Sequence, residues 1–593
     1  MSPHTTESRA LRSLTPAQRE AALSMGPTLV VAGPGSGKTH TLVSRLVYLI
    51  DSGLAQPHEL CAITFTRKAA AELAERLQRE LGEQASQLTV GTFHQLALRL
   101  RPLPAVVRLI HEADRHALLL HALRHSPYSG RALGDITLHR RARRVSEALS
   151  LQKGRSCADR DALGHPNPSI PASDQPPWLQ PAMSAYQAWM TALDLEDLDD
   201  LLVAATQVCQ ASTYACPYRF VHVDEYQDTS GVQRELLLAL SHAGAQIFAI
   251  GDPDQSIYAF RGASLSNFFA FPSDFPGSRI CYLRENFRAT STLVKATTAL
   301  ISQASDRGPF ADGPPPQAQR AAGERVQLYP AHSPLSEAIA IAREIERLVG
   351  GTSLTSHDQK RATAWASGRF SFSDIAVLTR TAARADDVAM ALHREGIPTL
   401  RPRKVRPRGE VDVPTDDSAN APGSAASDRS ASDAVATRAS LADALAQAPS
   451  TPQEVKPAGD ATSPQERSAY DVLRRALSPV SDDELGLAHE SDEWDARFER
   501  VAVLTLHGAK GLEFPVVFLC GSEAELLPGR ASSPDAIAEE RRLFYVGMTR
   551  AKDLLWISHV GPRSPFVDAL PTDCIASTTP PPRRAKPPQL KLF

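Results

Sequence analysis

Residues 28–39 read TLVVAGPGSGKT, a run of apolar residues followed by three glycines, a lysine and a threonine. The apolar run predicts a short buried strand, and the apolar residues from Leu42 to Ile50 recur at helical spacing. A strand, a glycine-rich turn and a helix form the context that a nucleotide P-loop requires. We therefore expect an α/β fold built around a phosphate-binding turn. A glycine-rich turn without a ligand is the alternative, but the Lys-Thr pair in register after the third glycine argues against it.

The chemistry of this turn favours ATP with Mg²⁺. The glycines let backbone N–H groups surround phosphate oxygens, and the new helix points its positive end at the same anion. Lys38 would reach the β- and γ-phosphates, and Thr39 would hold Mg²⁺. Ala32 stands where the strict pattern has its first glycine. The residues expected at the nucleotide are Ala32, Gly33, Pro34, Gly35, Ser36, Gly37, Lys38, Thr39 and His40.

A short helix is predicted just before the P-loop strand. Thr15 suits its N-cap and Pro16 its first helical position. Gln18 then lies near the nucleotide, where its amide can donate to and accept from adenine at once. A surface position is the ordinary alternative for a lone glutamine, and the closeness of Gln18 to the P-loop favours the adenine contact.

Length and composition indicate a large protein of a reducing cytosol. A chain of 593 residues, 42% of them hydrophobic, implies several globular domains. The net charge of −3 neither indicates nor excludes a nucleic-acid partner, since a basic groove can be local. The seven cysteines form no CxxC pair, which argues against zinc sites and disulfides. There is no membrane-length apolar run and no secretory segment, so a cytoplasmic protein without membrane contact is expected.

Residues 61–66 and 88–94 predict two further strands, with a helix beginning at Arg67 between them and a loop after the second strand. Strands that alternate with helices imply a parallel sheet with its sites at the carboxyl ends of the strands. Aromatic, hydroxyl and basic groups at these ends suit stacking on bases and contacts to a phosphate backbone. A core position is the alternative for the aromatics; we expect it for Phe93 and not for Phe65. The candidate DNA-binding residues here are Phe65, Thr66, Arg67, Thr92 and His94.

A second nucleotide element follows a predicted strand at residues 219–223. Two adjacent acids come directly after it. Asp224 would hold Mg²⁺, directly or through water. Glu225 would orient and deprotonate the attacking water. An acidic turn on the surface is the less favoured alternative.

A further predicted strand, residues 246–250, leads into a loop that carries polar and aromatic groups. Gln255 lies where it could sense the γ-phosphate. Tyr258 and Phe260, two residues apart, could stack on bases. Such a loop would connect hydrolysis to movement of the strand.

Three further blocks follow these motifs: LRENFR at residues 283–288, LTLHGAKGLEF at 504–514 and EERRLFYVGMTRAK at 539–552. With all of these motifs in this order, the chain resembles the UvrD/Rep-type superfamily 1 DNA helicases. The resemblance covers about residues 11–100, 185–300, 370–400 and 500–570. It implies two RecA-like α/β domains with ATP bound between them.

The resemblance also implies roles for residues of the later blocks. Arg288 and Arg550 would be arginine fingers that stabilise charge on the γ-phosphate when the cleft closes. Phe287 would pack on adenine, and Glu513 would contact the ribose or organise the cleft. The expected DNA-backbone contacts are His507 and Lys510. Phe260 stands where the family often has Trp, and Gly508 where it often has Ser. The family binds single-stranded and 3′-tailed DNA and moves 3′ to 5′.

We expect the family's large second insertion to be reduced here to a linker and a remnant. Residues 401–467 are rich in Ala, Ser, Asp, Pro and Thr and read as disordered, and a helical remnant at 468–498 follows. The expected boundaries are 1–98 and 200–275 for the first RecA-like domain, 99–199 for its helical insertion, 276–400 and 499–570 for the second domain, 401–498 for the reduced insertion and 571–593 for a flexible tail.

The tail ends in Gln589-Leu590-Lys591-Leu592-Phe593 after a Pro/Lys/Arg-rich tether. This ending resembles the motif that bacterial replication proteins insert into the sliding clamp, with Leu and Phe as anchors. A C-terminus without a partner is the alternative.

Three functions remain open from the sequence. The first is an ATP-dependent 3′–5′ DNA helicase of repair or replication. The second is a single-strand translocase that unwinds weakly, because the accessory insertion is reduced. The third is a clamp-tethered DNA-binding adaptor with a vestigial ATPase, which the intact catalytic set argues against: Lys38, Asp224, Glu225, Gln255, Arg288 and Arg550.

Overall fold

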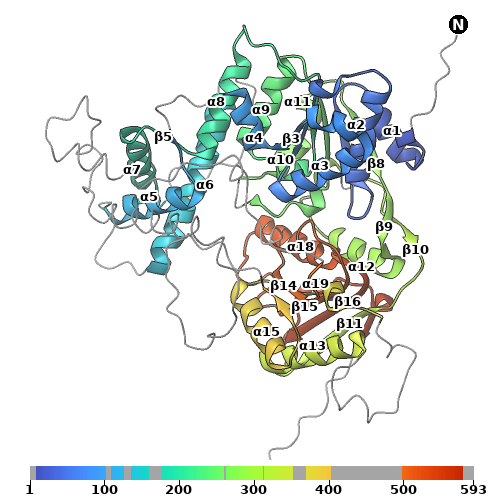
Figure 1. The fold of residues 1–593 in the computed structure, drawn as a ribbon. Coiled ribbons are helices and arrows are strands. Elements are labelled where there is room, and N and C mark those ends of the chain that lie inside the picture. Colours follow the sequence, from blue (N-terminus) through green and yellow to red (C-terminus); the bar gives the residue numbers. More distant parts are fainter. Residues whose placement is uncertain are drawn as a thin grey trace, which may run out of the picture.

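The computed structural model describes residues 9–101, 108–125, 135–158, 176–259, 262–310, 313–350, 369–401 and 497–577. Two parallel β-sheets covered by helices form its main bodies (Figure 1), which confirms the predicted α/β class with two P-loop-type domains. Phe260, the greater part of the reduced insertion and residues 578–593 with the clamp-like ending lie outside the described residues. Residues 571–577, which we expected to begin a flexible tail, instead form a 3₁₀ turn and a strand that pairs in the second sheet. Within the described ranges, no helix is both long and apolar enough to cross a membrane.

The first sheet has six strands, and its order places the P-loop strand beside the last one in the chain. The order is β3 (Thr89–Thr92), β2 (Leu60–Thr64), β6 (Phe220–Val223), β7 (Gln246–Gly251), β1 (Thr28–Ala32) and β8 (Arg279–Leu283). β8 pairs in parallel with β1, so the first sheet extends past residue 275, where we expected its domain to end. Local pattern cannot reveal this, because β8 joins the sheet through a partner some 250 residues earlier.

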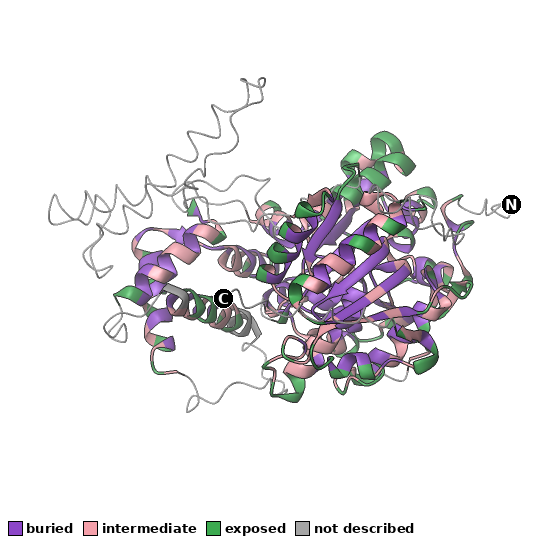
Figure 2. Ribbon diagram, turned by 90° about the horizontal axis from the view of Figure 1, so that it is seen from below, coloured by how far each residue is buried: buried purple, intermediate pink, exposed green. Residues whose placement is uncertain are grey.

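Helices cover both faces of this sheet, as an all-parallel sheet requires. Its strands are apolar without alternation; Leu29 and Val30 of β1 and Ile247 of β7 are fully buried. Phe93 is buried in the same core, as expected. Figure 2 shows strands enclosed by helices whose outer faces are exposed. The helices are α1 (Pro16–Leu23), α2 (Lys38–Asp51), α3 (Arg67–Leu81), α4 (Phe93–Leu100), α9 (Gly231–His242), α10 (Leu265–Phe269) and α11 (Phe271–Asp274).

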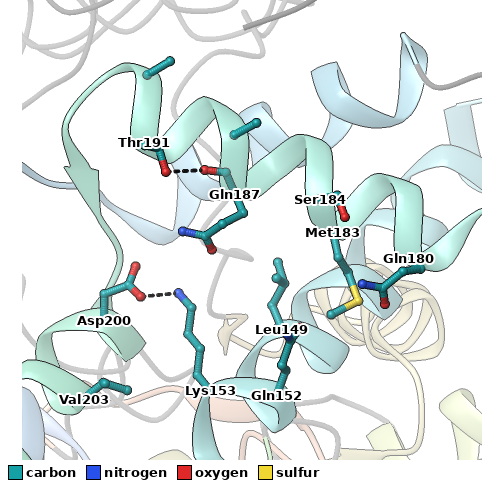
Figure 3. Close-up of a pocket in the computed structure, with 12 residues that line it drawn as sticks. Leu149, Gln152, Lys153, Gln180, Met183, Ser184, Gln187, Thr191, Asp200 and Val203 are labelled. Carbon is teal, nitrogen blue, oxygen red and sulfur yellow. Dashed lines mark hydrogen bonds and ion pairs between the residues drawn. The ribbon is translucent and has the colours of Figure 1, made fainter. Parts of the chain in front are cut away.

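A helical subdomain stands beside the first sheet (Figure 1). It contains β4 (Arg108–Leu109), α5 (Glu112–Arg124), α6 (Asp135–Ala158), α7 (Leu179–Ala192) and β5 (Leu195–Glu196). The next helix, α8 (Leu198–Gln210), packs its buried residues into the core of the first sheet. The acidic segment at residues 194–202 contains β5 and then Asp197 as the N-cap of α8. A cavity of about 820 Å³ lies between α6, α7 and α8, and Figure 3 shows Lys153 pointing at Asp200 across it.

The second sheet has seven strands in the order β13 (Thr399–Leu400), β14 (Val501–Thr505), β12 (Ile375–Thr379), β15 (Phe514–Cys520), β16 (Ala551–Val560), β11 (Val326–Ala331) and β17 (Ile575–Ser577). Its helices are α12 (Ser291–Ile301), α13 (Pro334–Val349), α15 (Ala382–Arg394), α18 (Pro534–Met548) and α19 (Pro565–Asp568). A two-stranded parallel ladder, β9 (Glu285–Thr290) with β10 (Gln317–Arg320), leads from the first sheet to this body.

Candidate active site between the two sheets

The P-loop turns at two glycines in the left-handed region. Gly35 has φ 71° and Gly37 has φ 81°, and Gly37 is the N-cap of α2. A Cβ at Gly35 would lie 2.5 Å from Cβ of Arg288, so this position also lets β9 approach the loop. Lys38 Nζ donates to the carbonyls of Ala32 at 3.1 Å and Gly33 at 3.3 Å. The loop therefore presents the start of α2 and an ammonium group to one space, as an anion site does.

Gln18 is buried against this loop. Its backbone N–H donates to Thr15 Oγ1, and its side-chain oxygen accepts from Thr15 N, which forms a capping box at the start of α1. Its Nε2 donates to the carbonyl of Ser36 at 2.8 Å. The structure thus places Gln18 beside the P-loop, and the adenine contact remains a prediction.

Two acids follow β6, one protonatable and one charged. Burial and the neighbouring Glu225 raise the pKa of Asp224 to about 7. Burial raises the pKa of Glu225 too, but Lys38 and Lys510 outweigh it, so the pKa of Glu225 is lowered overall. Glu225 also has φ 52°, a strained conformation for a non-glycine residue and typical of functional sites. A charged, positioned carboxylate of this kind can act as a general base.

The hard oxygen donors that Mg²⁺ prefers stand on two elements of the first sheet. Thr39 is in the first turn of α2, and Asp224 follows the end of β6. A hydroxyl and a carboxylate beside a phosphate cradle fit this ion. Thr39 and Asp224 would therefore suit Mg²⁺ next to a bound phosphate group.

The loop after β7 meets an arginine of the second body. Gln255 Nε2 donates to Asp252 Oδ2 at 2.6 Å, and Arg550 Nη2 donates to Gln255 Oε1 at 2.9 Å. Arg550 also donates to the carbonyls of Val546 and Leu512. Burial and the nearby Arg288 lower the pKa of Arg550 to about 9. The structure therefore brings Gln255 and Arg550 together across the interface.

Strand β9 lies directly on the P-loop. Asn286 Nδ2 donates to the carbonyl of Pro34 at 2.8 Å, and Phe287 N donates to that of Gly35 at 2.9 Å. The ring of Phe287 is 46% exposed, which leaves a face free for stacking. The sequence motif contained Asn286, but nothing in the local pattern indicated its contact with the loop.

Arg288 is held by Glu513. Arg288 Nη2 lies 2.6 Å from Glu513 Oε2, and Lys552 Nζ lies 2.6 Å from the other oxygen. Among the described residues, the buried Nε of Arg288 has no hydrogen-bond acceptor. A phosphate oxygen is the kind of group that would satisfy this donor.

Phe65 and Tyr258, two aromatic residues expected to contact DNA, stack on each other. The rings of Phe65 and Tyr258 have centroids 5.2 Å apart and an interplanar angle of 18°, and Tyr258 is 2% exposed. Lys510 Nζ lies 4.8 Å from the centroid of Tyr258 and 2.5 Å from Asp228 Oδ2. The predicted contact of Lys510 with a DNA backbone does not fit this arrangement, because its ammonium is buried in an ion pair between the two bodies.

The remaining predicted DNA residues lie at the carboxyl ends of β2 and β3. Thr66 caps α3, which begins at Arg67, and Thr92 caps α4. We expected His94 to lie in a loop, but it lies in helix α4. Thr92 and Gln95 form a capping box that starts this helix at Phe93. His94 is buried, and His507 is half-buried. Gln227 and Asp228, to which the sequence analysis gave no role, also contact site residues.

The first of the two parallel sheets carries a P-loop and an acid pair, and the connecting ladder and the second body bring two arginines toward them. These features define a two-domain P-loop protein. The chain matches two family models, the UvrD/REP helicase N-terminal domain over residues 14–276 and the UvrD-like helicase C-terminal domain over residues 281–404 and 465–561. It therefore belongs to the UvrD/Rep helicase family, which confirms the resemblance seen in the motifs.

Named relatives match nearly the whole chain. ATP-dependent DNA helicase UvrD1 of Mycobacterium tuberculosis strain H37Rv is 30% identical, over 97% of this chain and 88% of its own length. ATP-dependent DNA helicase PcrA of Staphylococcus epidermidis strain ATCC 12228 is 26% identical over 93% of this chain and 86% of its own. PcrA of Staphylococcus aureus strain NCTC 8325 is 25% identical over 91% and 82%.

Proposed function

We propose that this protein is an ATP-dependent DNA helicase that moves 3′ to 5′ on single-stranded DNA and unwinds 3′-tailed duplexes, in the cytoplasm, during DNA repair or replication. The observation that carries the proposal is the bond from Arg550 to Gln255 across the two bodies. It makes an ATP site whose cationic and anionic halves are assembled only when the bodies meet. The relatives' names support DNA as the substrate.

In this function the first sheet binds ATP and positions water. The nine residues from Ala32 to His40 hold the phosphates, with Gln18 and Phe287 at adenine. Thr39 and Asp224 hold Mg²⁺, which would screen phosphate charge. Glu225 accepts the proton of the attacking water. Arg288 leaves its ion pair with Glu513. Arg288 and Arg550 then stabilise the charge on the transferred phosphoryl group. Gln255 senses this phosphoryl group through its hydrogen bond to Arg550.

DNA would bind where the aromatic side chains gather beside this site. Opening the Phe65–Tyr258 stack would expose two ring faces to bases, and Phe260 would extend the platform. Thr66, Arg67, Thr92, His94 and His507 would line the backbone path. Lys510 would reach this path only after releasing Asp228.

The chain ending, residues Gln589 to Phe593, remains our candidate for binding a bacterial sliding clamp. It lies outside the described residues and is proposed on its sequence alone. A peptide of residues 580–593 should bind purified clamp, and the same peptide with Leu592 and Phe593 changed to Ala should not.

A second candidate is a translocase that unwinds weakly. The C-terminal family model leaves residues 405–464 unmatched, and these residues lie in the part of the chain where we expect a reduced accessory insertion. The same ATPase and unwinding assay separates the two functions, because the translocase hydrolyses ATP on DNA without separating strands.

The test is the ATPase rate with and without single-stranded DNA, together with unwinding of 3′-tailed and 5′-tailed duplexes. DNA-stimulated hydrolysis with unwinding of the 3′-tailed duplex is expected, and Lys38→Ala should reduce both by about 100-fold or more. Lys295→Ala is the control, since Lys295 lies on the surface in an exposed pair with Asp573. Hydrolysis that DNA does not stimulate would contradict the motor and leave the DNA-binding adaptor.

A further inference from the structure

One buried amide connects the proposed general base to the loop that receives Arg550. Gln227 lies in the 3₁₀ turn Tyr226–Asp228 after β6 and has no exposed surface. Its Nε2 donates to Glu225 Oε2 at 2.5 Å. Its Oε1 accepts from the backbone N–H of Asp252 at 2.9 Å. Both ends of a single side chain are therefore used, one on the acid and one on the loop.

The surrounding backbone is shaped for this amide. A Cβ at Gly251, the last residue of β7, would lie 2.4 Å from Gln227 Oε1. A residue with a side chain at position 251 would therefore displace the amide. The hydroxyl of Ser256 donates to the backbone carbonyl of Gln227 at 3.2 Å, which fixes the main chain of the same turn. Three contacts from the β7 loop thus converge on Gln227.

The acid that Gln227 contacts needs such support. Glu225 has φ 52°, and a strained backbone persists only where its surroundings hold it. The carboxylate can rotate about its own side-chain bonds, so the backbone alone does not fix its oxygens. A donor at 2.5 Å restrains one oxygen and leaves the other for a water molecule.

The loop on the other side of the amide is the one that meets the second body. Asp252, whose N–H binds Gln227, accepts through its carboxylate from Gln255, and Gln255 accepts from Arg550. A displacement of Arg550 therefore reaches Glu225 through three side chains, each of them buried.

We propose that Gln227 is a positioning residue that orients the carboxylate of Glu225 for proton abstraction and ties its orientation to the Asp252–Gln255 loop. The inference rests on the proposed function, since it requires Glu225 to be the general base. Gln227 itself touches neither water nor phosphate in this role. Its effect is confined to the rate of hydrolysis and leaves ATP binding in place.

The first test is Gln227→Met, which keeps the length of the side chain and removes both hydrogen bonds. The single-turnover rate of ATP hydrolysis on DNA should fall by about 10- to 100-fold, while the Kd for ATP changes less than about 3-fold. A thermal unfolding midpoint close to that of the wild type would show that the fold is retained.

Gln227→Glu separates the hydrogen bond to Glu225 from the hydrogen bond to Asp252. The new side chain keeps an acceptor for Asp252 N but removes the donor to Glu225 Oε2. The single-turnover rate should therefore fall about as far as in Gln227→Met, while the Kd for ATP again stays within about 3-fold of the wild-type value.

Gln246→Glu is the matched control. Gln246 is the first residue of β7, the strand that ends at Gly251. Its Oε1 accepts from Gly26 N at 3.0 Å, a hydrogen bond that Glu preserves. Its single-turnover rate and its Kd for ATP should equal those of the wild type. A wild-type rate in Gln227→Met, or a loss that comes with weakened ATP binding and a lowered unfolding midpoint, would overturn the inference.

Glu225→Gln separates this inference from the function beneath it. If Glu225→Gln is inactive and both Gln227 variants are fully active, the positioning role is wrong and the base assignment stands. If Glu225→Gln hydrolyses ATP at the wild-type rate, the base assignment is wrong, and the role of Gln227 falls with it.

Discussion

The two parallel sheets have the same architecture but carry opposite chemistry at the interface between them. The first presents the P-loop, the acids Asp224 and Glu225, and the Asp252–Gln255 loop. The second body presents arginines and a lysine: Arg288 on the connecting ladder, Lys510 after β14 and Arg550 after α18. Under the proposed function, neither half would complete a phosphoryl-transfer site alone. The reaction would then be controlled by how the halves meet, and three experiments can test this dependence.

The strongest test removes a cation from the second body. Arg550→Ala should lower kcat for ATP hydrolysis on DNA by about 10³-fold or more, because an arginine finger stabilises charge that develops only in the transition state. Binding of ATP, which rests on the first sheet, should change little. Steady-state kinetics and nucleotide titration measure the two effects. Arg563→Ala, at an exposed pair with Asp568, is the control, and equal losses of binding and rate would contradict the division.

An intermediate effect is expected where the halves are already in contact. Lys510 and Asp228 form an ion pair that is buried on both sides. Asp228→Asn leaves the ammonium buried without its partner charge, so it should destabilise more than the double change with Lys510→Met does. Thermal unfolding of the two single variants and the double variant should give a coupling energy of about 1–3 kcal/mol.

The exposed pair Arg563 and Asp568 should give nearly additive effects in the same cycle. Additive effects at Lys510 and Asp228 as well would mean that the two halves are not held together by this pair in solution. The contact would then belong to one state of a moving interface.

The smallest effect concerns the acid whose pKa the site raises. The folded-state pKa of Asp224, about 7, lies above the ordinary aspartate value of 3.8, so the folded protein binds more protons between these values. Stability therefore falls as pH rises through this window. Asp224→Asn removes this cost, so its unfolding midpoint without nucleotide should exceed that of the wild type by a few degrees at pH 8, about 2–4 °C, and match it near pH 4. If the midpoints of the variant and the wild type differ by the same amount at both pH values, the raised pKa of Asp224 is contradicted.

Local motifs predicted the parts of the site that a short segment forms by itself. The P-loop turn needs only its glycines and the start of α2, and the acid pair needs only the end of β6. Their positions along the chain could therefore be read from residue types and spacing. The family resemblance added the arginines, which the structure places at the interface.

What the sequence could not predict depends on contacts between distant segments. The burial of Lys510 follows from its pairing with Asp228, 282 residues away. The two hydrogen bonds of the Gln227 side chain require a glycine at position 251 on a neighbouring strand, because a Cβ there would displace the amide. His94 shows the reverse case: a capping box at Thr92 and Gln95 was visible in the sequence, but we gave priority to the strand pattern and placed a loop there.

One feature of the second sheet bears on how this chain can change in length. Strand β13 ends at Leu400, β14 begins at Val501, and the two strands pair with Thr399 opposite Val501. The segment between them leaves and re-enters the sheet at neighbouring points, roughly one strand spacing of 4.8 Å apart. The free energy of closing such a loop grows only with the logarithm of its length. A protein engineer could therefore insert, shorten or exchange a module at this junction while the pairing of β13 with β14 keeps its register.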